Sequence, residues 1–194
     1  MPKTQRPQVT LPYGEVAFAS LNKAKSFQEG EKAKFAVTLI YSQANVDKAI
    51  EQIAKALRAA DPALTEKAAI KLASKNGKGA DRFTEDGEDS GRFKFSASQA
   101  EEIHNAKGEL IATFEVPCLD SKGARYTTVP RVGKGTIASP IVELSVFATG
   151  MVFRLKAVVI KKLVEFGSGN DLGEFVAPEN DNDFPDAYAA DQSF

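Results

Sequence analysis

The sequence predicts a mainly β protein, namely a compact antiparallel barrel or sandwich with helices inserted between its early strands. Many short segments alternate apolar and polar residues and are rich in β-branched side chains, which is typical of strands. Two apolar stripes with helical spacing lie between the early strands. A length of 194 residues with 43% hydrophobic side chains is enough for a real core in about one domain. An OB-type barrel with a helical insertion is one solution that satisfies this pattern.

The first strands follow a loose lead-in. Residues 1–13 contain three prolines and no apolar periodicity. Glu15–Leu21 then alternates and predicts a short strand, followed by a polar turn region at 22–30. Lys34–Tyr41 predicts a second strand, because it is β-branched and places four apolar side chains on one face: Phe35, Val37, Leu39 and Tyr41.

A helical insertion is expected at about residues 45–76. Asn45 is a candidate N-cap, and the first helix carries an apolar stripe of Val46, Ile50, Ile53 and Leu57. Asp61 followed by Pro62 predicts the start of a second helix. The expected buried stripe of that second helix is Leu64, Ala68 and Leu72.

Strands dominate the second half. A long polar loop at 76–91 precedes a short strand, Arg92–Phe95. Ser98 and Glu101 have capping-box spacing, which predicts a brief helix that stops at Gly108. The strands expected after it, the last of them bent, are Leu110–Val116, Ala124–Val129, Ile141–Thr149 and Val152–Phe166.

The charges are divided unevenly along the chain. The formal net charge is only -1, which by itself argues against a nucleic-acid-binding protein. However, residues 1–162 hold all 25 basic residues and 18 acidic ones, whereas the remainder holds 8 acidic residues and no basic one. The body therefore carries +7 and the remainder -8. We expect one nucleic-acid-binding domain at 14–177 and a disordered acidic tail at 178–194.

Rare residues argue against several kinds of site. Cys118 and His104 are the single cysteine and histidine, so an intramolecular disulfide, a Cys-rich zinc site and a His-pair metal site are excluded. Cys118 is expected in the core and His104 on the surface. The acidic run at 85–89 lacks EF-hand spacing and predicts a solvated loop. The longest uncharged apolar stretch, Leu144–Phe153, is about half a membrane span. No enzyme activity, cofactor, metal or membrane association is expected.

Aromatic residues alternate with cations at three places. In Arg92-Phe93-Lys94-Phe95 the two rings share one face of a strand and the two cations the other. The pairs Arg82-Phe83 and Arg125-Tyr126 repeat the combination in more open segments. These rings are either core residues or platforms on which bases stack, as in OB-type barrels that bind single-stranded nucleic acid.

Further cations occur in pairs near loops and strand edges. They could hold phosphates or could simply be a solvated face. The glycine-containing loop at 132–136 could bring backbone N–H groups to a phosphate, although it is not a Walker loop. The paired candidates are Lys23 and Lys25, Lys32 and Lys34, Arg131 and Lys134, and Arg154 and Lys156.

The tail combines acidic and aromatic residues and ends on an aromatic residue. A terminal ring with its carboxylate is a ligand that a partner can hold in an apolar pocket lined by basic groups. A plain solubility tail is the alternative. The residues expected to bind partners are Asp181, Asp183, Phe184, Asp186, Tyr188, Asp191 and Phe194.

Three stretches and this tail resemble the OB-fold single-stranded DNA-binding proteins of phages. The stretches are AFASLNKAKSFQEGEKAKFAVTLIY, DKAIEQIAKAL and GMVFRLKAVVIKKLVEFG. The resemblance implies sequence-independent binding of single-stranded DNA in replication and recombination, in the cytoplasm of the infected host. It also implies a tail that competes with DNA and recruits replication or recombination proteins, and homo-oligomerisation is an option. Phe194 matches the family's terminal aromatic, but Ser193 precedes it where related bacterial tails have Pro.

Two other functions stay open. A structural or scaffolding phage protein would use the tail to control assembly and would not bind oligo-dT. A nuclease would need positioned carboxylates and Mg²⁺.

Overall fold

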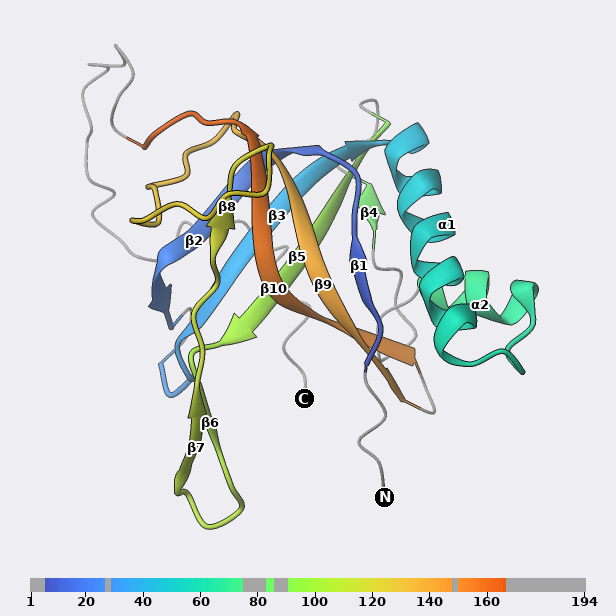
Figure 1. Cartoon of the computed structure of the whole chain (residues 1–194), viewed down its shortest axis with the longest axis horizontal. Coiled ribbons are helices and arrows are strands. Elements are labelled where there is room, and N and C mark those ends of the chain that lie inside the picture. The colour runs from blue at the N-terminus through green and yellow to red at the C-terminus, as the bar shows by residue number, and fades with distance from the viewer. Residues whose placement is uncertain (1–5, 27–28, 75–82, 86–90, 148–149, 167–194) are drawn as a thin grey trace.

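The computed structural model describes residues 6–26, 29–74, 83–85, 91–147 and 150–166. Within these residues, five strands form a closed barrel in the order β9-β2-β3-β5-β10, and pairing between β9 and β10 completes the circle (Figure 1). The barrel strands are β2 (Gly14–Lys25), β3 (Lys34–Ser42), β5 (Arg92–Ala100), β9 (Ile137–Phe147) and β10 (Gly150–Lys162). The predicted OB-like barrel, mainly β with inserted helices, is confirmed.

The inward side chains of the barrel strands form the core. The four apolar residues predicted to share one face of β3 are all buried: Phe35, Val37, Leu39 and Tyr41. Four rings pack together in the core, with the centroids of neighbouring rings 5.3 to 6.1 Å apart, and they come from three strands and one loop: Tyr41, Phe83, Phe95 and Phe153. Cys118 is fully buried, as expected, and burial raises the pKa of its thiol to about 11.

Not every strand pairing is antiparallel. β10 runs parallel to β5, with Arg154 opposite Ser98, and parallel to β8 (Cys118–Leu119). β10 also has register shifts after Leu155 and after Ile160, so it is bent as predicted. A register shift between Val16 and Phe18 moves Phe18 to the other face of β2 from Val16, which corrects the expected alternation of that strand.

Short edge strands were missed. Gln8–Thr10, expected to be part of a loose lead-in, form β1 and pair with β9. Thr84–Glu85, inside the expected polar loop, form β4 beside β5. β2 also continues through part of the expected turn region and ends at Lys25.

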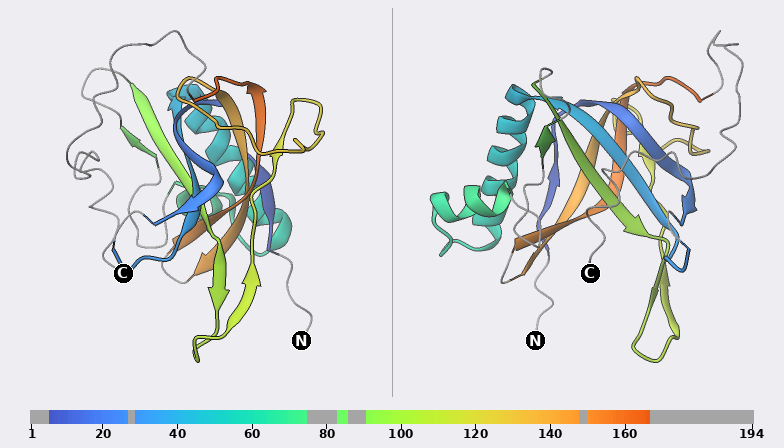
Figure 2. Two further views of the ribbon diagram at one scale, coloured as in Figure 1. Left: turned by 90° about the vertical axis from the view of Figure 1, so that its left-hand side faces the viewer. Right: turned by 180° about the vertical axis from the view of Figure 1, so that it is seen from behind.

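Two helices stand at one side of the barrel, α1 (Gln43–Ala60) and α2 (Glu66–Ala73) (Figure 2). α1 starts two residues before the predicted cap, with Ser42 at the N-cap and Asn45 inside the helix. Asp61 ends α1, and Thr65 caps α2 by accepting a hydrogen bond from the Ala68 amide. The buried residues of α2 are Ala69 and Ala73, one position after the expected stripe.

The expected helix from Ser98 to Gly108 is wrong. β5 continues to Ala100, and residues 102–113 form a hairpin of β6 (Glu102–His104) and β7 (Leu110–Thr113). This hairpin projects from the barrel on the side away from the helices (Figure 2). The alternation of SASQA, which buries Ala97 and Gln99, outweighs the capping-box spacing.

The segment 124–129 was expected to be a strand, but it has only an isolated bridge between Arg125 and Leu119.

Among the described residues, no helix is long and apolar enough to cross a membrane. The acidic run at 86–89 and the segment 167–194 lie outside the described residues, and so does the whole expected acidic tail.

Candidate nucleic-acid interface

A groove of about 830 Å³ opens at the end of the barrel where the hairpin begins. It lies between the end of β2, the residues that follow β7, and the segment 125–131. Its lining is Leu21, Asn22, Lys23, Phe35, Glu101, Thr113, Phe114, Glu115, Val116, Arg125, Tyr126, Thr127, Thr128, Val129, Pro130, Arg131, Glu165 and Phe166.

Three exposed cations line this groove, and sequence reasoning named each of them: Lys23, Arg125 and Arg131. Arg125 lies 3.3 Å from the Glu115 carboxylate, but both side chains are mostly exposed, at 61% and 80%. An ion pair with that exposure contributes little stability, so Arg125 can exchange Glu115 for a phosphate at small cost.

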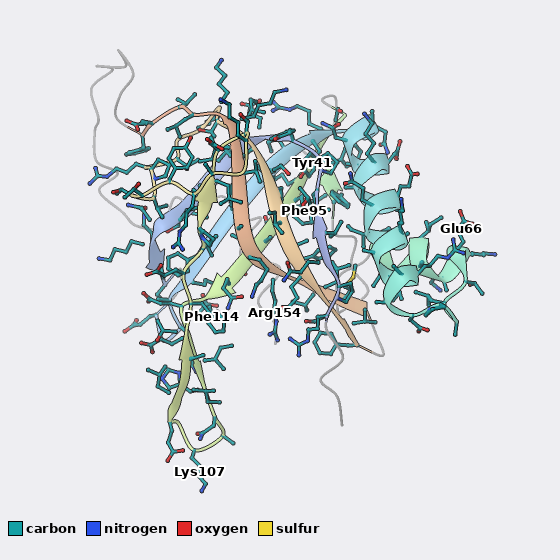
Figure 3. The ribbon with its side chains drawn as sticks, in the orientation of Figure 1. Tyr41, Glu66, Phe95, Lys107, Phe114 and Arg154 are labelled. Carbon is teal, nitrogen blue, oxygen red and sulfur yellow. The ribbon has the colours of Figure 1, made fainter. Side chains whose placement is uncertain are left out.

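Three rings accompany the cations. Tyr126, which sequence reasoning named, is half-buried, and its amide donates to the Cys118 carbonyl. Phe166 is 70% exposed, and its amide donates to the Arg131 carbonyl, so the backbones of these two residues are held next to each other. Phe114 is half-buried where the hairpin joins the barrel (Figure 3). A groove lined by cations and accessible rings suits a strand of unpaired nucleotides.

Local turns hold the walls of the groove in place. Asp120 Oδ1 accepts hydrogen bonds from the amides of Lys122 and Ala124 at 2.8 Å, and Gly123 closes the turn at φ +84°. This turn leads into Arg125 and Tyr126. The segment that carries Phe166 is fixed by Thr136, whose hydroxyl bonds both the amide and the carbonyl of Val164.

The glycine-containing loop does not offer its amides to a phosphate. Gly133 donates to the Val164 carbonyl at 2.7 Å, Gly135 to the Val16 carbonyl, and Thr136 to the Gly133 carbonyl. These three amides are therefore used within the protein, which argues against a phosphate contact through them. Lys134 remains exposed on this turn but does not line the groove.

A second cationic surface covers the outward side of β3, β5 and β10. We call it the strand face, formed by Lys34, Ala36, Thr38, Ile40, Lys94, Ser96, Ser98 and Arg154. Its centre consists of small side chains, and the Thr38 and Ser96 hydroxyls lie 2.9 Å apart in a mutual hydrogen bond. Arg154 and Lys156 point outward opposite the buried Phe153 and Leu155, as predicted.

Lys156 connects the strand face to the groove. It occupies the irregular position between Leu155 and Ala157. Its ammonium lies 3.9 Å from the Glu143 carboxylate and 5.7 Å from the centre of the Phe114 ring, which lines the groove. A cation over an aromatic ring is attracted to it. Lys156 thus follows Arg154 along β10 and reaches the Phe114 ring, so it lies at the border between the strand face and the groove.

The remaining named residues lie in different surroundings. Phe83 and Phe95 belong to the core and are closed to a base, and Phe93 packs against the same core. Arg92 lies 3.0 Å from Glu15 at the far end of the strand face. Lys25 is exposed at the end of β2, opposite Lys34, and Lys34 lies 3.5 Å from Glu31.

Lys32 contacts the hairpin rather than the groove. Its ammonium lies 3.3 Å from His104 Nδ1, and His104 Nε2 lies 3.4 Å from the Glu102 carboxylate. Among the residues that the structure describes, no three His, Cys, Asp or Glu side chains gather where they could hold a metal. Arg82 and the named tail residues lie outside the described residues.

Sequence reasoning missed Phe114 and Phe166. Each was counted as part of an expected strand, in which a ring is most simply a core residue. Both rings lie beyond the end of a regular strand: Phe114 follows β7, and Phe166 follows β10. The end of the alternation between apolar and polar residues before each ring is the sequence signal that could have identified them.

No family model and no curated protein matches the chain. In structure, the chain is similar to gp2.5, a single-stranded DNA-binding protein encoded by bacteriophage T7. The TM-score is 0.59 at 20% identity, over 90% of this chain and 97% of that one. It is also similar to the single-stranded DNA-binding protein from bacteriophage Enc34, solved in complex with single-stranded DNA. That match has a TM-score of 0.47 and 14% identity, over 82% of this chain and 88% of the other. The T7 match confirms, at the level of the fold, the resemblance that the sequence indicated.

Proposed function

We propose that the chain is a phage-type protein that binds single-stranded DNA without sequence preference and without catalysing a reaction. The observation that carries this proposal is the groove, in which three exposed cations and three rings that are not buried meet at the end of an OB-like barrel. The fold is shared with the T7 protein, which binds single-stranded DNA, and this likeness supports the same ligand.

The groove chemistry favours unpaired bases. Rings such as Tyr126 and Phe166 can stack only on bases that are not already stacked inside a duplex, and every base offers a π-face. Stacking therefore selects single strands but not a sequence. Lys23, Arg125 and Arg131 supply the contacts to phosphates, which add affinity for any strand.

The proposal extends to the tail and to the cell. The acidic residues of 178–194 compete with DNA for the cations of the body, and Phe194 engages replication or recombination proteins once DNA displaces the tail. The charge split of +7 against -8 supports this competition. The protein acts in the cytoplasm of the infected host.

Fluorescence anisotropy with labelled oligo-dT and a matched duplex tests the proposal. We expect tight binding to oligo-dT, much weaker binding to the duplex, and no cleavage of either when Mg²⁺ is added. If about four phosphates are contacted, raising salt from 50 to 200 mM weakens binding roughly 50-fold. Affinity that is unchanged across this range would overturn the phosphate contacts, and Mg²⁺-dependent cleavage would indicate a nuclease. Defined self-assembly without oligo-dT binding would indicate a scaffolding protein.

A further inference from the structure

We propose that a second pocket, at the far end of the strand face, is a base-stacking subsite with Tyr13 as its platform. This inference rests on the proposed function. It assigns a path to the DNA, which would enter at the groove, cross the strand face and end on Tyr13.

The pocket has a volume of about 360 Å³ and lies where β2 and β5 begin and β3 ends. Outward side chains of β2, β3 and β5 line it. These three strands are neighbours in the sheet, where Glu15 pairs with Ile40 and Arg92 pairs with Ser42. The complete lining is Tyr13, Gly14, Glu15, Ile40, Tyr41, Ser42, Asn45, Gly91, Arg92 and Ile137.

Tyr13 presents an accessible ring on a fixed backbone. Its side chain is 38% exposed, while its carbonyl accepts a hydrogen bond from Asn45 Nδ2 at 3.1 Å. The buried Tyr41 hydroxyl donates to the preceding carbonyl, that of Pro12, at 2.9 Å. Gly14 packs so tightly that a Cβ there would come within 2.7 Å of the Tyr41 ring. A ring held in this way loses little freedom when a base stacks on it.

The charges around Tyr13 suit a nucleotide. The Lys161 ammonium lies 5.4 Å from the centre of the Tyr13 ring. Lys161 is not among the residues that line the pocket, so it adds positive charge next to the ring without occupying the pocket. Within the pocket, Arg92 lies 3.0 Å from Glu15, and both side chains are nearly half exposed. A phosphate can therefore compete with Glu15 for Arg92.

The strand face joins this pocket to the groove. Ile40, which lines the pocket, pairs across the sheet with Lys94, and β5 carries Arg92 into the pocket and leads at its other end to Glu101 in the groove. The extended chain from Arg92 to Glu101, nine residue-to-residue steps, spans about 30 Å. That length is compatible with site sizes of about 4 to 16 nucleotides per OB-type barrel.

A length series of oligo-dT, from dT4 to dT16, tests the subsite in the full-length chain. Tyr13→Ala should weaken binding of dT16 roughly 5- to 150-fold, the usual loss for one stacked base, and leave dT4 unchanged. Tyr13→Phe, which keeps the ring, should bind both oligonucleotides as the parent does. Tyr126→Ala is the matched control in the groove and should weaken both.

A fluorescent side chain in the pocket gives a second readout. The chain contains no tryptophan, so Tyr13→Trp creates a single indole probe. A base that stacks on this indole should quench its emission, and we expect quenching by dT16 but not by dT4. Glu15→Gln removes the acid that competes for Arg92 and should tighten binding of dT16 several-fold.

The outcomes separate the subsite from the proposed function. If the parent protein binds dT16 and Tyr13→Ala binds it equally well without a change in quenching, the subsite is overturned while single-stranded DNA binding stands. If the parent protein binds no oligo-dT, the proposed function fails first. Equal weakening of dT4 and dT16 by Tyr13→Ala would place Tyr13 within the first contact site and overturn the proposed path.

Discussion

At the scale of single residues, burial decides which of the aromatic side chains can contact a ligand. Phe95 and Phe166 are the same residue type, yet Phe95 is fully buried and Phe166 is 70% exposed. Phe95 stacks on Phe83 with centroids 5.3 Å apart and stabilises the barrel. Phe166 contributes little to the core, so its ring remains available for stacking on a base.

Replacing the exposed rings should separate binding from stability. We expect Phe166→Ala and Tyr126→Ala each to weaken oligo-dT binding by about 1–3 kcal/mol, the usual contribution of one stacked base. The melting temperature of Phe166→Ala should change little, because its ring is largely in solvent. Anisotropy titration and thermal unfolding monitored by circular dichroism measure the two effects.

Phe95→Ala provides the contrasting control. Removing the Phe95 ring leaves a cavity beside the three rings that pack against it and should lower the free energy of unfolding by about 3–5 kcal/mol. Normal DNA binding by both Phe166→Ala and Tyr126→Ala would contradict the assignment of the groove as the stacking site.

Cys118 predicts a pH dependence of stability. Burial raises the pKa of its thiol from 9.0 to about 11, because the charged thiolate is disfavoured inside the barrel. The unfolded chain therefore loses this proton at lower pH than the folded chain. The stabilisation is complete below pH 9 and is lost as the pH rises through 11.

Urea unfolding at pH 8 and at pH 10.5 measures this effect. We expect the parent protein to lose more stability across this interval than Cys118→Ala does, because the variant lacks the thiol. Burial also raises the pKa of Tyr41, which both proteins share, so the comparison isolates Cys118. Equal losses in the two proteins would show that the thiol does not titrate differently on folding.

At the scale of secondary-structure elements, regular alternation was predictable and irregular backbone was not. The faces of β3 and the outward cations of β10 followed from the sequence, because a buried strand face has a period of two. The hairpin of β6 and β7 did not, because the Ser98–Glu101 spacing suited a helix cap. Pairing with β3 instead extends β5 to Ala100, and the two hairpin strands then pair with each other. Likewise, the groove depends on contacts between distant segments, such as Phe166 with Arg131, which no local pattern reveals.

The turn at 131–136 should influence DNA binding through packing alone. A Cβ on Gly133 would lie 3.0 Å from the Val164 carbonyl and 3.1 Å from the Phe166 amide. Gly133→Ala should therefore push Phe166 aside, lower the free energy of unfolding by about 1–3 kcal/mol and weaken oligo-dT binding. Anisotropy and urea unfolding measure both effects.

Gly108→Ala in the hairpin is the matched substitution. Gly108 has φ +83° with open space around it, so alanine strains the backbone there without touching the groove. We expect Gly108→Ala to change stability but not DNA binding. Equal binding by Gly133→Ala and Gly108→Ala would show that the position of Phe166 does not matter.

At the scale of the whole molecule, the small net charge hides two opposed parts. A body of +7 and a remainder of -8 on one chain attract each other more than they would as separate molecules, because the tether keeps their effective concentration high. Such attraction weakens as salt screens it. The tail should therefore act most strongly on DNA binding at low ionic strength.

Deleting residues 178–194 tests the tail. We expect the truncated chain to bind oligo-dT more tightly than the parent at 50 mM salt, and the difference to shrink at 300 mM. A chain in which the tail's aspartates become asparagines, with Phe194 kept, should behave like the truncation if charge is responsible. Unchanged or weaker binding by the truncated chain would rule out competition between tail and DNA.

The closing of the barrel by its last strand has a consequence for biosynthesis. β10 completes the circle by pairing with both β9 and β5, and the groove also needs Phe166, which follows β10. A ribosome must therefore release about 166 residues before the groove can exist. Nascent chains that have emerged only as far as β9 carry the cations but no finished groove. Under the proposed function, the stacking site is therefore one of the last parts of the protein to form.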